Sequence, residues 1–411
     1  MSPHDPRDRG FRDRTSVAAV LALIDARVGP IGVEAVDLAS ASGRVLAAVA
    51  IATGPVPLFD RAAMDGFALR GEETFGAEAY TPAVFRCVGR SRPGRPCDVE
   101  VGPGLAVAIA TGAPMPRGAD AVAKVESTRV DGEAVQVFEA VPPGRHVSRR
   151  GEDVGAGEAV LSPGRVLRPQ DLAALSAIGL ARVEVVGRPR VVVLVTGDEL
   201  LPPGTLAEGC SIADANSPML AALVARDGGI ARVVGPLPDE RSTLRAALVE
   251  AARSADLILV SGGSSTGPED HAPGLVAELG ELAVHGVAIR PASPAGLGFL
   301  GTVPVALLPG NPVSCLCAYD FFGGRALRRL AGRPADWTYR PVVRPLSRKL
   351  ASPVGRVDYA RVRLTDAGVE PMAVGGASIL SSVTRADGFV VVPADLEGYP
   401  AGAEVTAWLY D

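Results

Sequence analysis

The sequence predicts a multidomain protein in which an α/β domain lies between a β-rich region and a small C-terminal β domain. Three observations support this. Buried apolar runs alternate with amphipathic segments across residues 190–330, short Val, Ala and Ile runs are broken by Gly and Pro across 29–182, and short alternating segments return after 339. A chain of 411 residues is long enough for two to four domains.

The N-terminal part begins with a charged stretch. The first ~14 residues are predicted to be disordered, and they contain no apolar core of a secretory signal. Residues 15–28 then predict an amphipathic helix, with Thr15 or Ser16 as its N-cap. Within the β-rich region that follows, only residues 169–179 read as a helix.

The middle of the chain alternates strands and helices. Strands are predicted at residues 190–195, 231–235, 256–260, 282–289, 297–300 and 303–308. Helices are predicted at 216–227, capped by Asn216, at 239–253, capped by Asp239, and at 270–279 and 313–330. Because the connections are short, we predict a parallel sheet of the doubly wound type.

The C-terminal part is predicted to be all β. Residues 332–337 form a linker, and the segments YARVRL, GFVVVP and AEVTAWLY alternate in hydropathy. These short segments favour a small β-barrel or sandwich.

Composition excludes several classes of protein. The net charge is −5 and no basic stripe carries interleaved aromatics, so nucleic acid is not an expected partner. The longest apolar runs, 191–195 and 303–308, are far shorter than a membrane span. The five cysteines form no CxxC pair, which indicates reduced thiols in the cytoplasm and no Cys/His zinc site. Nearly all basic residues are arginines, since the only lysines are Lys124 and Lys349.

Polar groups follow three of the predicted strands. Thr196-Gly197-Asp198-Glu199 follows the first, the run from Ser261 to Asp270 follows the third, and Pro309-Gly310-Asn311-Pro312 follows the last. Ligands bind at the carboxyl ends of parallel strands. Glycine turns that lead into helices suit phosphate, and carboxylates suit Mg²⁺. Together they fit a phosphorylated ligand bridged by a metal, although there is no Walker A loop.

Each group also has a structural interpretation. Asp239 and Asn311 are possible helix caps, and Gly262 and Gly263 are possible tight-turn residues. Asp65 could belong to a turn, and Arg149 and Arg150 to a solvated surface. Cys315 and Cys317, at helical spacing, are interpreted as core residues.

The order of several motifs points to one family. FDRAAMDGFALR is similar to a FDNSAMDGYA stretch and IATGAPMPRGADAV to MTGAPVPEGADAV. SRRGEDV, VTGDEL, DANSPML, VSGGSSTGPEDH, LPGNPVS and GRVDYARV follow in the same order. Over nearly its whole length the chain resembles the MoeA family, which includes the gephyrin E-domain.

The resemblance implies a domain plan. Residues 1–32 would form an N-terminal helix on the α/β domain, and 33–51 with 158–189 a first β domain. Residues 52–157 would form an inserted β-rich domain. The first β domain and this inserted domain would together form an elongated N-terminal region. Residues 190–337 would form a MogA-like α/β domain that binds molybdopterin, and 338–411 a C-terminal β-barrel.

The resemblance also implies an activity. Family members of this kind would insert molybdenum from molybdate into adenylylated molybdopterin and release AMP, with Mg²⁺ held by Asp239, Asp270 and Glu199. A homodimer is implied, in which Asp65, Thr111 and Asp153 act together with these three carboxylates. The implied partners are the adenylyltransferase and client molybdoenzymes or their chaperones. The implied substrate-binding residues are Thr111, Gly262, Gly263, Ser265, Gly267, Arg290, Ser293, Pro294, Pro309, Asn311, Pro312, Arg356, Arg361, Ser381 and Ser382.

The chain departs from the family pattern at one loop. The family reads KPGKP where this chain has Arg290-Pro291-Ala292-Ser293-Pro294, so a lysine is replaced by Ser293. Arg61-Ala62 also replaces Asn-Ser before AMDG. The loss of a cation keeps open a paralogue specialised for tungstate or one client enzyme. The interaction role of gephyrin-like chains keeps open a scaffold that binds pterin or protein without turnover.

Overall fold

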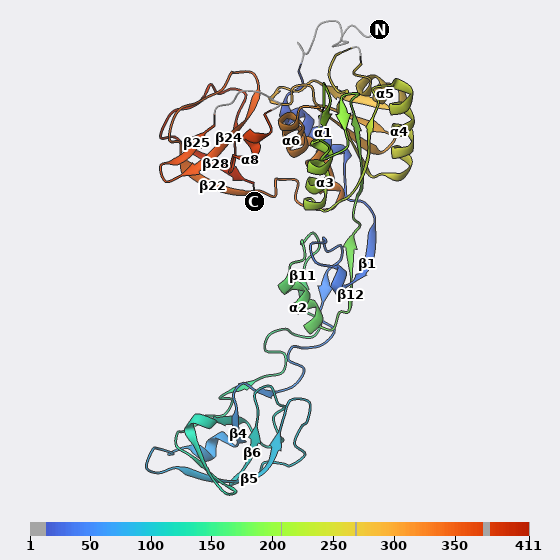
Figure 1. Cartoon of the computed structure of the whole chain (residues 1–411). Helices are drawn as coiled ribbons and strands as arrows, with labels where there is room; N and C mark the ends of the chain where they lie inside the picture. Colours follow the sequence, from blue (N-terminus) through green and yellow to red (C-terminus); the bar gives the residue numbers. More distant parts are fainter. Residues whose placement is uncertain (1–13, 207, 268, 373–378, 411) are drawn as a thin grey trace. The chain divides into compact units, whose positions relative to one another are not determined.

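The computed structural model describes residues 14–206, 208–267, 269–372 and 379–410. Ala35–Ser42 and Ala48–Glu184 form one compact unit, called unit 2, and the other described residues form unit 1 (Figure 1). The predicted division into five segments is finer than these two units and stays a prediction. The stretch predicted to be disordered lies outside the described residues, apart from its last residue.

Unit 2 is built around a six-stranded sheet. Its order is β7-β4-β6-β5-β9-β8, and all neighbours are antiparallel except β5 and β6. Phe67, Phe85 and Val135 lie in its core. The strands are β4 (Gly66–Leu69), β5 (Ala83–Ser91), β6 (Leu105–Ile109), β7 (Ala121–Lys124), β8 (Thr128–Asp131) and β9 (Ala134–Val137).

Short antiparallel strand pairs accompany this sheet. β2 (Ala50–Ile51) pairs with β11 (Ala159–Leu161), and β3 (Arg61–Ala62) pairs with β10 (Val147–Ser148). The predicted helix is α2 (Pro169–Ala177). β1 (Val33–Asp37) and β12 (Arg182–Val186) form a further two-stranded sheet.

The first six-stranded sheet of unit 1 contains all six strands predicted for the α/β domain. Its order is β16-β13-β17-β21-β20-β18, and the first four strands are parallel. β20 runs antiparallel to both of its neighbours, β18 and β21, whereas the prediction was a parallel sheet. No helix lies between β18 and β21 to carry the chain across the sheet for a parallel connection. The strands are β13 (Arg190–Thr196), β16 (Ile230–Leu237), β17 (Leu257–Ser261), β18 (Glu281–His285), β20 (Gly296–Leu300) and β21 (Val303–Leu308).

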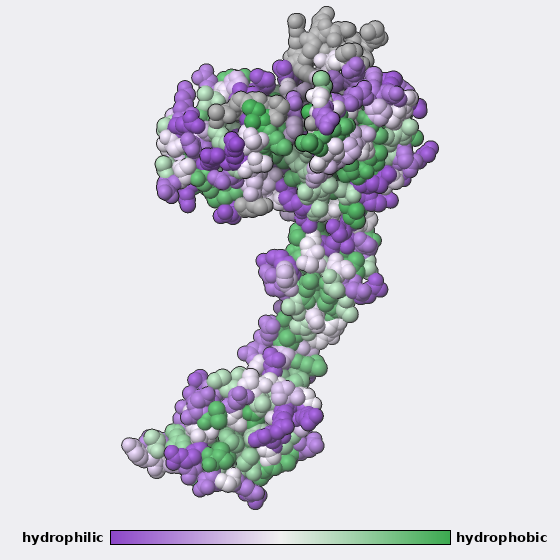
Figure 2. Space-filling view, viewed as in Figure 1, coloured by the Kyte–Doolittle hydropathy of each residue, from purple (hydrophilic) through white to green (hydrophobic). Residues whose placement is uncertain are grey.

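Helices cover both faces of this sheet because side chains of a strand alternate between faces. Val191 and Val193 of β13 belong to different cores than Val192 and Leu194. α4 (Arg241–Ser254) and α5 (Ala272–Leu279) pack on one face, and hydrophilic residues gather over α4 (Figure 2). The other face is covered by α1 (Val17–Arg27), α3 (Asn216–Arg226), α6 (Pro312–Ala318) and α7 (Gly324–Leu330).

Two predicted helix caps are wrong. Ser16 caps α1 by accepting from Ala19 N, as expected. Asn216, however, is the first residue of α3, and Asp214 Oδ1 instead accepts from its N–H at 2.9 Å. Asp239 lies before the cap residue Glu240 of α4, since its carboxylate is engaged at the end of β13. Both side chains can therefore form hydrogen bonds with residues at the ends of strands, Asp239 with Thr196 and Asn216 with Ser261.

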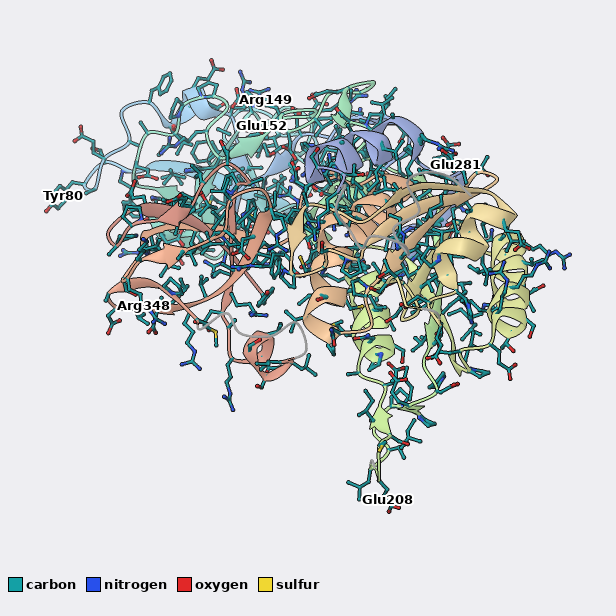
Figure 3. All side chains as sticks on the ribbon, turned by 90° about the horizontal axis from the view of Figure 1, so that it is seen from above. Tyr80, Arg149, Glu152, Glu208, Glu281 and Arg348 are labelled. Atoms are coloured by element: carbon teal, nitrogen blue, oxygen red, sulfur yellow. The ribbon has the colours of Figure 1, made fainter. Side chains whose placement is uncertain are left out.

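The C-terminal sheet continues directly from the α/β part. β19 (Ile289–Arg290) pairs in parallel with β24 (Val357–Thr365), and the order is β19-β24-β26-β28-β22 with β25 beside β24. β14 (Leu200–Leu201) pairs with β15 (Ile212–Ala213), and Glu208 lies at the tip of their connection (Figure 3). The remaining elements are β22 (Arg340–Pro345), β23 (Leu350–Ala351), β25 (Gly368–Pro371), α8 (Ser381–Thr384), β26 (Gly388–Val392), β27 (Gly398–Tyr399) and β28 (Glu404–Leu409).

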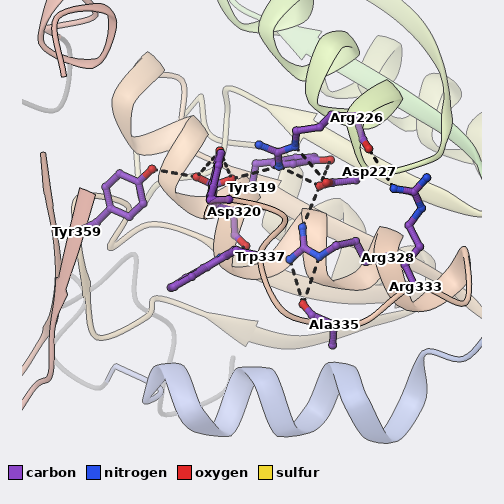
Figure 4. Close-up of polar contacts among 10 residues, drawn as sticks. Arg226, Asp227, Tyr319, Asp320, Arg328, Arg333, Ala335, Trp337 and Tyr359 are labelled. Atoms are coloured by element: carbon purple, nitrogen blue, oxygen red, sulfur yellow. Dashed lines mark hydrogen bonds and ion pairs between the residues drawn. The ribbon is translucent and has the colours of Figure 1, made fainter. Parts of the chain in front are cut away.

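Unit 1 also contains a buried polar network around the turn between α6 and α7. A π-helical turn at Tyr319–Gly323 joins α6 to α7 and carries Asp320 into the interior. Asp227 binds Arg328 and Tyr319, and Asp320 accepts from the hydroxyl of Tyr359 at 2.9 Å (Figure 4). Every described helix is too short or too polar to cross a membrane.

Candidate functional site

The strand ends of unit 1 surround a cleft of about 510 Å³, which we call the carboxylate cleft. It lies where the sequence predicted, since its walls come from the segments after β13, β17 and β21. The predicted residues that line it are Glu199, Asp239, Gly262, Gly263, Ser265, Asp270, Pro294, Pro309, Asn311 and Pro312. The cleft therefore brings together ten residues proposed from the sequence.

Two of its carboxylates are held by backbone groups. Asp239 accepts from the Thr196 hydroxyl and from Asp198 N–H at 3.3 Å, while Asp239 N–H donates to Asp198 Oδ1 at 3.0 Å. Asp270 Oδ2 accepts from Gly267 N–H at 2.7 Å. Glu199 is exposed at the rim. These contacts orient Asp239 and Asp270 before any ligand binds.

The donor set suits Mg²⁺ only in company with a ligand. Among the described residues, no three His, Cys, Asp or Glu side chains gather closely enough to hold a metal on their own. Mg²⁺ commonly uses one or two carboxylates together with waters and substrate phosphates. The hard oxygens of Asp239, Asp270 and Glu199 in one cleft fit that mode of binding.

The glycine turn after β17 has a steric requirement. Gly262 has φ 95° and Gly263 has φ 56°, a region that favours glycine. A Cβ on Gly262 would lie 2.3 Å from the carbonyl oxygen of Thr196. The tight packing of the turn thus accounts for Gly262 by itself, and a role in phosphate binding stays a prediction.

Asn216 is a cleft residue that sequence reasoning missed. Its Nδ2 donates to Ser261 Oγ at 2.9 Å and to the Gly310 carbonyl at 2.7 Å, while its buried Oδ1 has no partner among the described residues. An unpaired buried acceptor is costly unless a ligand donor satisfies it. The sequence interpretation as a helix cap hid this role.

A second cavity of about 380 Å³, the arginine cavity, adjoins the cleft and shares Pro294, Pro309 and Asn311 with it. Its other walls combine the loop after β19 with the start of β24. The predicted residues that it adds are Arg290, Ser293, Arg356 and Arg361.

The arginines of this cavity differ in their partners. Arg290 forms an ion pair with Asp358, whose side chain is only 1% exposed. Arg361 is 2% exposed, and its Nε and Nη1 have no hydrogen-bond partner among the described residues. A buried guanidinium with unused donors is the kind of group that binds an oxyanion.

Several predicted residues lie elsewhere. Gly267 is outside both cavities but donates to Asp270, and Ser381 and Ser382 lie in α8, where Ser382 Oγ donates to the Ile379 carbonyl. Asp65, Thr111 and Asp153 belong to unit 2, all with exposed side chains.

Asp65 and Thr111 form a pair in unit 2. The N–H and hydroxyl of Thr111 both donate to Asp65 Oδ1, at 2.7 and 3.0 Å, and the backbone bond foremost lowers the pKa of Asp65. Asp65 is therefore an anion rather than a proton donor at neutral pH.

The two adjacent cysteines are core residues, as predicted. Cys315 and Cys317 are fully buried in the main core of unit 1. Burial raises the pKa of the Cys315 thiol to about 12, so it is protonated at neutral pH and no nucleophile.

Sequence models of three regions match nearly all of the chain. They are the MoeA N-terminal region (domain I and II) at residues 15–179, a probable molybdopterin binding domain at 192–329, and the MoeA C-terminal region (domain IV) at 343–410. A molybdopterin molybdenumtransferase 2 of Mycobacterium tuberculosis is 36% identical over 91% of this chain and 94% of the relative. The chain belongs to the MoeA family.

Other similar proteins support the same family assignment. A molybdopterin molybdenumtransferase of Haemophilus influenzae is 31% identical over 92% of this chain and 94% of its own length. The crystal structure of a molybdopterin biosynthesis MoeA protein from Pyrococcus horikoshii is 32% identical, with a TM-score of 0.83 over 97% of this chain and all of that one. The multidomain α/β and β fold predicted from the sequence is thus confirmed. The carboxylate cleft lies in the region matched to the probable molybdopterin binding domain, while the arginine cavity adds Arg356 and Arg361 from the MoeA C-terminal region.

Proposed function

We propose that this protein is a molybdopterin molybdenumtransferase, which inserts molybdenum from molybdate into adenylylated molybdopterin with Mg²⁺-dependent hydrolysis and release of AMP. The names of its relatives support the overall reaction. Two adjoining cavities of different chemistry support the finer statement, because the reaction needs one place for a phosphorylated ligand and another for an oxyanion.

One observation carries the proposal: Arg361 lines the arginine cavity, is buried, and has two donor groups without a partner among the described residues. Leaving a charged donor unpaired in the interior costs several kcal/mol, roughly the desolvation penalty of an ion. Molybdate offers two negative charges and oxygens that accept from a guanidinium. Binding of molybdate would relieve this cost.

The carboxylate cleft would hold the adenylylated substrate. Its phosphates would lie near the N–H groups of the turn from Gly262 to Gly267. Asp239, Asp270 and Glu199 would hold Mg²⁺, which when bound supplies neutralising charge for the phosphates. The protein itself would mainly orient the two substrates, and Asn216 Oδ1 would accept from a donor of the pterin or nucleotide.

We further propose a cytoplasmic homodimer. In this arrangement Asp65, Thr111 and Asp153 of unit 2 would serve the partner's site, as the family resemblance implies. The five cysteines are free thiols, in line with a reducing compartment. Contacts with the adenylyltransferase that supplies the substrate, and with client molybdoenzymes or their chaperones, would be transient.

A paralogue specialised for tungstate is the second candidate. Ser293 on the cavity wall favours it, since this residue brings no charge of its own to the oxyanion. A scaffold without turnover is less well supported, because it would have no use for a buried arginine at a cavity with two donor groups unpaired among the described residues.

AMP release from adenylylated molybdopterin, measured with Mg²⁺ while molybdate or tungstate is titrated, tests the proposal. We expect saturation at low molybdate, loss of molybdate dependence in Arg361→Gln, and no change in Arg253→Gln, a variant at an exposed ion pair on α4. Release with tungstate alone would favour the specialised paralogue. Tight substrate binding without any release would favour the scaffold.

A second variant tests the carboxylate cleft. We expect Asp270→Ala to abolish AMP release while the thermal midpoint stays unchanged, since among the described residues its side chain bonds only to Gly267 N–H. Unchanged turnover would contradict the role given to Asp270.

A further inference from the structure

We propose that Arg14 is an additional oxyanion-binding residue of the arginine cavity, held in place by Ser293. This inference rests on the proposed function, because it assigns molybdate to that cavity. Arg14 lies outside every motif that indicated the function, and it directly follows the N-terminal stretch that the structure does not describe.

The contact between the two residues is direct. Arg14 Nε donates to Ser293 Oγ at 2.8 Å, and Ser293 lines the arginine cavity. The Arg14 side chain is exposed, and among the described residues its two Nη groups have no acceptor. Arg14 does not itself line the cavity, but its guanidinium is bonded to a residue that does and has donors to spare.

Ser293 is occupied by this arrangement. Its hydroxyl donates to the Val287 carbonyl at 3.2 Å while it accepts from Arg14. A serine hydroxyl has a single proton, so the side chain of Ser293 has no donor left for an anion. Ser293 is thus a positioning residue for Arg14 rather than a ligand of the oxyanion.

The backbone beside Arg14 is anchored to the same loop. Thr15 N–H donates to the Gly286 carbonyl at 3.0 Å, and Ala288 N–H donates to the Thr15 carbonyl at 2.8 Å. Ser16 then begins α1 as its N-cap. These bonds fix the point from which the Arg14 side chain extends, so its approach to Ser293 is built into the fold.

The charges of the cavity explain what Arg14 adds. Arg290 is paired with the buried Asp358, so this pair brings no net charge. Arg356 and Arg361 then match the two charges of molybdate without excess. Among the described residues, Arg14 raises the number of guanidinium groups without an ion-pair partner to three, and charge-assisted hydrogen bonds are the strong ones.

Calorimetric titration of the full-length protein with sodium molybdate tests the proposal. We expect Arg14→Gln to weaken binding about tenfold, which corresponds to about 1.4 kcal/mol. Arg14→Lys should retain part of the affinity, and Arg253→Gln should bind like the wild type.

Two readouts separate charge from structure. Raising the salt concentration should weaken binding more steeply in the wild type than in Arg14→Gln, since one cation fewer contacts the anion. Adding Ser293→Lys to Arg14→Gln should restore affinity, because the new ammonium enters the cavity from the same wall. Thermal midpoints should be equal in all variants.

The outcomes distinguish the two proposals. If the wild type binds molybdate, Arg361→Gln does not, and Arg14→Gln binds unchanged, then the role of Arg14 is overturned and the proposed function stands. If the wild type binds neither molybdate nor tungstate, the assignment of the cavity falls, and the inference about Arg14 falls with it. Weaker binding in Arg14→Gln without rescue by Ser293→Lys and without a change in salt dependence would also refute the inference.

Discussion

Removing Arg328 should destabilise unit 1 strongly. The side chains of Arg328 and Asp227 are 1% and 0% exposed, and they form an ion pair of 2.9 Å (Figure 4). The guanidinium also donates to the Ala335 carbonyl at 3.2 and 3.1 Å. Arg328→Met would keep an apolar stem of similar length but leave the carboxylate and the carbonyl with fewer partners.

The expected loss in the free energy of unfolding depends on the partners that Asp227 keeps in Arg328→Met. Breaking a buried ion pair by removing one partner costs about 3–5 kcal/mol. Asp227 would keep the Tyr319 hydroxyl at 3.0 Å and Arg226 at 3.1 Å, so the lower end applies, about 3 kcal/mol. For a body of this size each kcal/mol lowers the thermal midpoint by roughly 2 °C, which gives about 6 °C.

Differential scanning calorimetry of the full chain measures this loss. Arg253→Met is the matched control, because Arg253 and Glu250 are 74% and 64% exposed and 3.7 Å apart. Such a surface pair contributes about 0–1 kcal/mol. Pairing Arg328→Met with Asp227→Asn should recover part of the loss. A midpoint for Arg328→Met equal to that of the control would refute the reasoning about the buried network.

Three further predictions concern single residues. Burial foremost raises the pKa of Asp320 from 3.8 to about 6, so the folded state holds this proton more tightly than the unfolded one. Its contribution to stability is present in full below pH 3.8 and is lost as the pH rises to about 6. Melting curves of Asp320→Asn should lack this slope, and an unchanged slope would contradict the assignment. Ala292 has φ 90°, a strained conformation for a residue with a Cβ, so Ala292→Gly should raise the free energy of unfolding by about 0.5–1 kcal/mol in denaturant titrations. Lower stability would show that the loop is not strained. Thr111→Val should raise the pKa of Asp65 toward its ordinary value by removing the hydroxyl donor, while Thr111→Ser should not, as followed by carboxyl NMR titration.

The sheet of unit 1 was predictable because its strands are buried on both faces. Runs such as Val191–Val195 of β13 carry a strong local signal, and every predicted strand of this sheet is present. The antiparallel edge was not predictable from the runs alone, because strand direction depends on how the chain returns between β18, β20 and β21. Two-residue strands such as β19 carry no periodic signal at all.

The strand ends were located correctly, but two residues there were assigned as helix caps, which the structure contradicts. Asp239 was predicted both as a helix cap and as a strand-end carboxylate, and the structure places it in the cleft. Asn216 was predicted only as a cap, and the structure shows that it lines the cleft as well. Local rules fail most readily where a residue serves a site. The two donor groups of Arg361 that lack a partner among the described residues, and the contact of Arg14 with Ser293, 279 positions away, depend on long-range packing that no local pattern encodes.

The division of unit 1 along the chain has a consequence for synthesis. Helix α1 buries Val20 and Ile24 in the core of unit 1, and Asp25 binds Arg325, 300 positions later. A ribosome that adds roughly 5–20 residues per second needs roughly 15–60 s to synthesise the chain between Asp25 and Arg325. During this interval the apolar side of the nascent helix has no permanent cover, while unit 2 emerges and can fold. The first described helix is thus among the last to be packed into the core of unit 1.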